Sequence, residues 1–235
     1  MNTSMAAVLA GSLCLAGCVV ESDHMGALQY DSQQVDMDNA ESVQVNLKMG
    51  AGQLRVTDGS QKLMRGDFSY NVSEWKPKVR YEREGKTGVL TVEQPDSHHT
   101  RLGNTKYQWD LQLNNKVPMD LHLEFGAGDA KLDIGSLVLK SVRVDMGVGK
   151  LVMDLHGKPK QDYSVEVHGG VGEATIRLPS DQGLWVEATG GIGAINVRGL
   201  RKEGSHWESE GLDKAKVKIT VNVQGGIGAV NLIAD

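Results

Sequence analysis

Residues 121–134 read LHLEFGAGDAKLDI, and residues 142–155 repeat the pattern as VRVDMGVGKLVMDL. Four more segments share it: VQVNLKMGAGQLRV (43–56), VEVHGGVGEATIRL (165–178), VEATGGIGAINV (186–197) and ITVNVQGGIGAVNL (219–232). In each segment, apolar residues alternate with polar ones on both sides of a Gly-x-Gly triplet, and period two is the spacing of a β-strand. The sequence therefore predicts pairs of short strands that meet at a glycine corner.

The apolar phase shifts at each triplet. Val142, Val144, Met146 and Val148 keep period two and are expected on one face, and the phase then jumps by three to Leu151. Such a jump indicates a bend, since glycine permits the backbone angles and close approach that a bend needs. The predicted corner glycines are Gly50, Gly52, Gly126, Gly128, Gly147, Gly149, Gly170, Gly172, Gly191, Gly193, Gly226 and Gly228.

The repeats have the length of one coil of a β-solenoid. After Gly126, the triplets follow one another at 21, 23, 21 and 35 residues, and the last gap holds an insertion around 199–216. Stacked coils lie about 4.8 Å apart, so Val148, Val171, Ile192 and Ile227 are expected to form one apolar column. We predict an all-β, single-stranded β-solenoid with little or no helix outside the signal segment. A β-sandwich with glycine-rich turns is the alternative.

The first residues have the features of a secretory signal. Residues 5–17 form an uncharged apolar run of 13, too short to span a bilayer but long enough for a signal core. The run ends in Leu15-Ala16-Gly17-Cys18, which resembles a bacterial lipobox, although residues 1–8 contain no Lys or Arg. The resemblance implies that residues 1–17 are removed and that Cys18 carries acyl chains such as palmitate. An ordinary secretory signal with a chance cysteine is the alternative.

The chain divides into four expected regions. These are a signal peptide (1–17), the lipidated Cys18 with a polar tether (18–40), an N-terminal β region (41–117) and the C-terminal repeats (118–235), the last two separate or continuous. Within the N-terminal β region, MRGDFSYNV (64–72), KPKVRYERE (76–84) and TGVLTVEQP (87–95) each have the composition of a strand. Cys14 and Cys18 are the two cysteines, so no disulfide is expected after processing.

Two stretches together resemble a known family. LMRGDFSYNVSEWKPKVRYEREGKTGVLTVEQP (63–95) and WDLQLNNKVPMDLHLEFGAGDAKLDIGSLVLKSVRVDMGVGKLVMDL (109–155) resemble the bacterial toast-rack family. They are also similar to the C-terminal domain of LiaF-type cell-wall-active antibiotic response proteins and to DUF4097 adhesin-like proteins. The resemblance implies a β-solenoid of the bacterial envelope that has no assigned enzymatic residues and acts through partner proteins. LiaF-type relatives carry transmembrane helices, so their role as membrane sensors does not transfer directly.

The motifs that could carry chemistry have simpler structural explanations. A nucleotide-binding loop needs a helix after its glycines, whereas a strand is predicted after every triplet here. His98-His99 could ligate zinc, but the surroundings are polar and no cysteine survives nearby. Carboxylates such as Asp120, Glu124 and Asp145 alternate with apolar residues and therefore point outward. We expect no enzyme activity, no metal site and no cofactor.

Partner binding is the remaining class of function. The net charge is −5 and no Lys/Arg cluster stands out, so nucleic acid is not an expected partner. Trp75 and Trp207 lie in polar surroundings that favour exposure, and exposed tryptophan marks contact sites. We expect a lipid-anchored, non-catalytic scaffold or interaction module of the bacterial cell envelope, at the outer membrane if the cell has two, which binds envelope proteins in stress response or adhesion. A glycan-binding module that uses Trp75 or Trp207 is the alternative, and a polysaccharide-active β-helix enzyme is less favoured.

Overall fold

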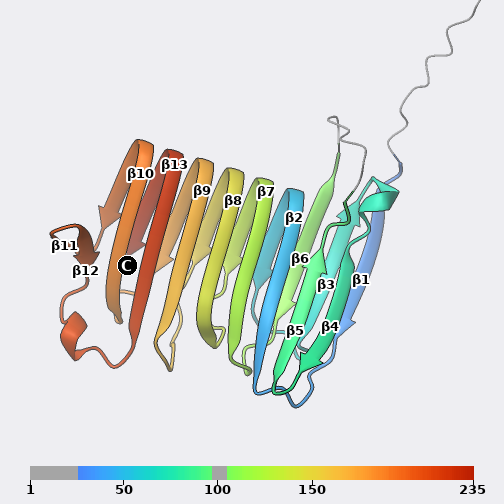
Figure 1. Ribbon diagram of the computed structural model, residues 1–235, viewed down its shortest axis with the longest axis horizontal. Helices are drawn as coiled ribbons and strands as arrows, with labels where there is room; N and C mark the ends of the chain where they lie inside the picture. The colour runs from blue at the N-terminus through green and yellow to red at the C-terminus, as the bar shows by residue number, and fades with distance from the viewer. Residues whose placement is uncertain (1–25, 97–104) are drawn as a thin grey trace, which may run out of the picture.

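Bent strands stacked side by side form most of the computed structural model, which describes residues 26–96 and 105–235 (Figure 1). The long bent strands are β2 (Ser42–Thr57), β7 (Met119–Asp133), β8 (Leu139–Asp154), β9 (Tyr163–Leu178), β10 (Gly183–Arg198) and β13 (Lys218–Ala234). Neighbours are parallel and in register, so that Gly128 pairs with Gly149 and Gly149 with Gly172. The predicted all-β solenoid is confirmed, and within the described ranges helix is limited to two short 3₁₀ turns.

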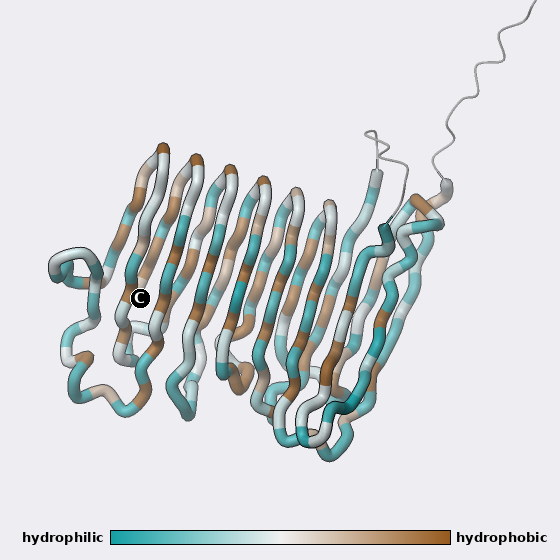
Figure 2. Tube along the Cα trace, viewed as in Figure 1, coloured by the Kyte–Doolittle hydropathy of each residue, from teal (hydrophilic) through white to brown (hydrophobic). Residues whose placement is uncertain are grey.

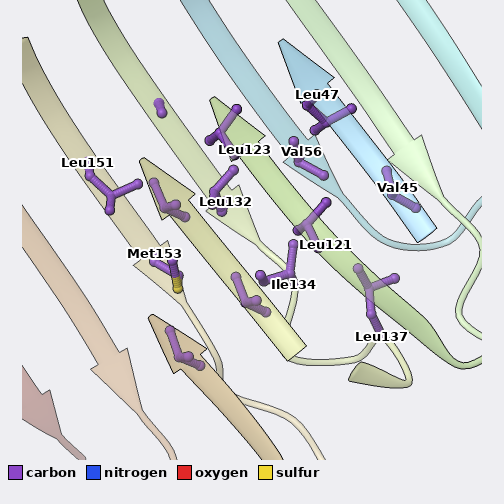
Figure 3. Packing of buried hydrophobic residues seen from close by; sticks show 14 of the residues in the cluster. Val45, Leu47, Val56, Leu121, Leu123, Leu132, Ile134, Leu137, Leu151 and Met153 are labelled. Atoms are coloured by element: carbon purple, nitrogen blue, oxygen red, sulfur yellow. The ribbon is translucent and has the colours of Figure 1, made fainter. Parts of the chain in front are cut away.

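Each bent strand has two arms whose apolar faces enclose the core. Leu121 and Leu123 of the first arm of β7 face Leu132 of its second arm and Ile134 just after it, and all four are buried (Figure 3). Alternation with period two places every second side chain on the inward face, and neighbouring coils add equivalent residues to the same rows. The core is therefore a layer between two facing walls, one formed by the first arms and the other by the second arms. The two walls meet at the corners.

Both glycines of a triplet are needed at the corner. Gly149 has φ of 133°, a region that side chains disfavour, and a Cβ there would overlap the carbonyl oxygen of Gly128 in the next coil. Gly147 has an ordinary φ, yet its Cβ would overlap the carbonyl oxygen of Gly126. The bend thus brings neighbouring backbones too close for any side chain at these two positions.

The stack does not follow chain order at its far end. The order is β2, β7, β8, β9, β13 and β10, so the last strand of the chain lies between β9 and β10. The insertion carries the chain back through β11 (Arg201–Glu203), β12 (His206–Glu208) and η2 (Leu212–Lys214). β12 pairs with Trp185 and Val186 and so covers only part of the first arm of β10.

At the other end the two arms of β2 are continued by separate strands. The first arm pairs with β5 (Thr87–Glu93), which pairs with β4 (Lys78–Glu84). The second arm pairs with β6 (Tyr107–Leu113), followed by β3 (Met64–Tyr70) and β1 (Gln29–Val35). β3, β4 and β5 lie where the sequence predicts strands. The predicted division near residue 118 falls between β6 and β7, and β2 pairs with β7 across it.

β1 differs from the expectation, because residues 29–35 were expected in the tether. Its sequence QYDSQQV is polar and its side chains are largely exposed. Backbone hydrogen bonds to β3 hold this strand at the edge of the sheet, where no buried apolar row is required. A strand of this kind leaves no period-two hydrophobic signal in the sequence.

Candidate functional site

All the long strands bend along one edge of the stack, which we call the corner edge. The middle residues of the triplets form a row along this edge. In strand order they are Ala51, Ala127, Val148, Val171, Ile227 and Ile192, each paired with the next. We call the last four the corner ridge. Figure 2 shows it as brown tips along one edge of the stack.

The predicted column exists, but its expected orientation is wrong. Val148 was expected on the inward face with Met146, whereas the exposed fraction of the ridge side chains runs from 47% for Val171 to 72% for Ile192. The reason is the bend: the chain reverses within the triplet, so the side chain of the middle residue points outward from the corner. The four side chains form a contiguous apolar strip, which is unusual on a protein surface and marks interaction sites.

A narrow cavity lies beneath the corner ridge. In β2, β7 and β8 the residue before the triplet is Met49, Phe125 or Met146. In β9, β13 and β10 the same row continues as Gly169, Gly225 and Gly190. Without these side chains, the corner contains a cavity of about 70 Å³. Its lining includes Met146, Val167, Ala174, Val223, Val230 and Ile195.

Glycine is not required by the backbone in the row of residues that precede the triplets. Gly169, Gly190 and Gly225 do not have positive φ, and a Cβ at Gly169 would have no atom within 4 Å. Sequence reasoning missed the cavity, although the signal was present. The doubled glycine of HGGVG, TGGIG and QGGIG replaces the apolar residue of MGAG, FGAG and MGVG. The ridge therefore has no side chain of this row beneath it in the three coils that carry Val171, Ile227 and Ile192.

A histidine–aspartate row crosses the outer face of the first arms. His122 Nε2 and His168 Nδ1 donate hydrogen bonds to the two oxygens of Asp145 at 3.0 and 2.9 Å, since a carboxylate only accepts. Arg143 also donates to Asp145, through Nε at 2.8 Å, and reaches Glu166 at 3.1 Å. Partial burial acts to raise the pKa of Asp145, but the bonds from Arg143, His122 and His168 outweigh it and lower the pKa to about 2.

This row joins three strands and is poorly suited to acid–base catalysis. A general base works best with a pKa near the operating pH, far above that of Asp145. Within residues 26–96 and 105–235, no three His, Cys, Asp or Glu side chains are placed to hold a metal ion. Other outward carboxylates lie in ion pairs, Asp120 with Lys140 and Glu124 with Lys48. These charges of the outer face are thus held in ion pairs.

The two tryptophans expected at contact sites have different surroundings. Trp75 was expected to be exposed, and this is wrong: its exposed fraction is 9%, and its ring lies edge-on to Tyr107 at 5.4 Å. The short turn η1 (Ser73–Trp75) directs the ring back onto the core. Trp207 is half-buried on β12, with Lys202 Nζ 5.4 Å from its ring centre. Cys18 and His98-His99 lie outside the described residues.

Most of the chain matches a described family. The model of the N-terminal domain of toast_rack, DUF2154, matches residues 24–177. The chain belongs to the toast-rack family. The toast-rack match spans β1 to Arg177, the second-last residue of β9. Within the described residues, no helix is long and apolar enough to cross a bilayer.

Solved structures share this architecture. A candidate cell adhesion protein from Clostridium sporogenes is 36% identical, with a TM-score of 0.86 over 89% of this chain and 100% of its own. A candidate adhesin from Bacteroides fragilis is 14% identical over 88% of this chain and 97% of its own, with a TM-score of 0.33. The backbone of the second protein agrees too little with this chain to bear on its function. A search of curated proteins finds no match.

Proposed function

We propose that this protein is a non-catalytic adhesion or interaction module of the bacterial cell envelope, anchored by lipid at Cys18. The observation that carries the proposal is the likeness to the Clostridium sporogenes protein, which covers the full length of that chain at 36% identity. The lipobox-like Leu15-Ala16-Gly17-Cys18 supports the anchor, which would hold the module at a membrane surface.

The shape supports a binding role. The stack offers two long, flat sheet faces, and the outer face of the first arms carries ordered ion pairs, among them Lys48 with Glu124 and Arg143 with Glu166. Charges held in fixed rows present a specific pattern to a partner, and the match needs no conformational change. A broad, rigid face of this kind suits an envelope protein as partner.

The test is crosslinking and affinity purification of the full-length protein from its own envelope, beside a Cys18→Ala variant. We expect specific protein partners with the parent chain and fewer with the variant. The mass of the Cys18 peptide tests the anchor separately, because acylation adds the mass of the lipid. Absence of any envelope partner from the parent chain would overturn the binding role.

A glycan-binding function is the alternative that this experiment separates. Burial of Trp75 removes one of its two candidate stacking residues, and Trp207 remains half-buried against the core. Retention of the parent chain by peptidoglycan, lost in Trp207→Ala, would favour the alternative. Equal retention of both chains would exclude Trp207 as the contact.

A further inference from the structure

The corner ridge and the first described residues lie on the same edge of the molecule. Register shows this strand by strand: Gln53, next to the corner, pairs with Gln108, Tyr107 pairs with Tyr70, and Tyr70 with Gln29. Leu28 and Ala51 border one hollow beside this corner. Figure 1 shows β1 starting at the edge where the long strands bend.

The chain before Gly26 therefore leaves from the corner edge. Cys18 precedes Gly26 by eight residues, which span at most roughly 27 Å when extended. A lipid on Cys18, the anchor of the proposed function on which this inference rests, would keep the corner edge close to the bilayer. It would leave the opposite edge, with the turn at 134–138, further away.

The corner ridge lies at the other end of this edge. Eight strand spacings separate β1 from β10, or about 38 Å at 4.8 Å each. Along the row, the middle residue of the triplet changes from alanine near β1 to valine and then isoleucine at the far end. The edge thus grows more apolar with distance from the chain that leads to the anchor.

We propose that the corner edge lies on the lipid bilayer and that the corner ridge enters its surface as a second attachment. The ridge would add buried apolar surface to the acyl anchor, and the two attachments would stand at the two ends of one straight edge. Charge is not expected to attract the edge to lipid: the residues directly after the triplets include the ion pair of Lys150 with Glu173 at 3.3 Å and one further acidic residue, Asp129, with no basic excess. The contact is therefore hydrophobic, and salt should not weaken it. Both outer faces of the stack, and the edge opposite the corners with the turn at 134–138, stay available to partners.

The experiment reconstitutes the full-length protein, purified from its envelope, into phosphatidylcholine vesicles that contain lipids brominated on the acyl chain. Ile192→Trp places a reporter on the ridge, and Ser136→Trp places one on the exposed turn at the opposite edge. The parent chain supplies the background of its own tryptophans. We expect at least threefold stronger quenching of the reporter at 192 than of the one at 136, unchanged between 50 mM and 500 mM salt.

A second variant separates ridge contact from proximity alone. Val171→Asp with Ile227→Asp, added to the Ile192→Trp reporter, should remove most of the quenching; both side chains are about half exposed, so the fold tolerates the change. Met37→Asp, a partly exposed apolar residue outside the row, is the matched control and should leave quenching unchanged.

Two results would overturn the inference. One is equal quenching at 192 and 136. The other is a ridge reporter that is shielded from water without quenching, in a protein that sediments as a dimer, because a second copy would then cover the ridge. An unmodified thiol at Cys18 would refute the anchor of the proposed function, but the quenching comparison would still decide whether the ridge enters lipid.

Discussion

Two glycines at the corners of neighbouring coils have opposite structural roles. Gly149 has a positive φ and lies against the backbone of the neighbouring coil, whereas Gly169, in the next coil, has an ordinary φ and faces open space. Composition alone does not separate them, since both belong to repeated glycine motifs. The difference lies in what surrounds a Cβ at each position.

Alanine substitutions test this difference at the residue scale. Gly149→Ala should lower the free energy of unfolding by about 2–3 kcal/mol, because it combines an unfavourable φ with overlap of a carbonyl oxygen. Gly169→Ala should stay within about 1 kcal/mol of the parent chain or exceed it, because alanine restricts the unfolded chain. Urea unfolding measures both. Equal losses in the two variants would show that the row of Gly169 is structurally required and that our account of the cavity is wrong.

At the scale of the element, side chains on the outer face supplement the backbone ladders. Asp145 on β8 receives hydrogen bonds from His122 on β7 and His168 on β9, so one carboxylate joins three strands. Its lowered pKa has a defined consequence for stability. A carboxylate that is easier to ionise in the folded state than in the unfolded state stabilises the fold above its unfolded pKa, near 3.8. That contribution is lost as the pH falls toward 2.

Asp145→Asn should remove this contribution. At pH 7 we expect a loss of about 1 kcal/mol, a modest figure because the row is partly exposed to solvent. Between pH 4 and pH 2 the stability of the parent chain should fall toward that of the variant. Urea unfolding across this pH range provides the measurement. Asp133→Asn, an exposed aspartate on β7, makes the same change in net charge and serves as control. A constant gap between parent chain and Asp145→Asn down to pH 2 would contradict the assignment.

Elements also show how far sequence reasoning extends. The bent strands could be predicted because their apolar faces are buried, which imposes period two and a phase shift at each corner. β1 could not, because an edge strand held by its backbone needs no apolar face. Trp75 was misplaced because its neighbours are polar while its ring turns inward onto Tyr107. The ridge was predicted as a column, but its outward direction depends on the geometry of the bend, which residue spacing does not encode.

At the scale of the whole molecule, the position of β13 is the least predictable feature. The segments around Gly191 and Gly226 have nearly the same sequence, GGIGAIN and GGIGAVN, so either would pair well with β9. Instead, β10 does not pair with β9, and β13, which comes later in the chain, lies between them. Asp235 then bonds to Leu178 through its backbone N–H and to Arg177 through its carboxylate.

Removal of β13 should therefore be far more damaging than loss of a terminal strand from a sheet edge. A chain that ends at Lys216 lacks the strand between β9 and β10 and exposes two long unpaired edges, which promote association. We expect soluble aggregates in size-exclusion chromatography and loss of the cooperative unfolding transition. As control, a chain that retains β13 but lacks the hairpin strands β11 and β12, with a short linker across 200–209, should elute at the same apparent size as the parent chain.

The closure of the stack by β13 has a consequence for how such a protein can change in length. A structure outside the repeat lies at each end of the stack: separate strands beside β2 and a hairpin beside β10. A new coil therefore cannot be added at either terminus of the chain, but it can be added by duplication of an internal unit such as residues 139–162. Each duplication would extend the edge by one rung, about 4.8 Å, and would leave both ends intact. The number of coils would then set the distance between the proposed anchor beside β1 and the hairpin beside β10.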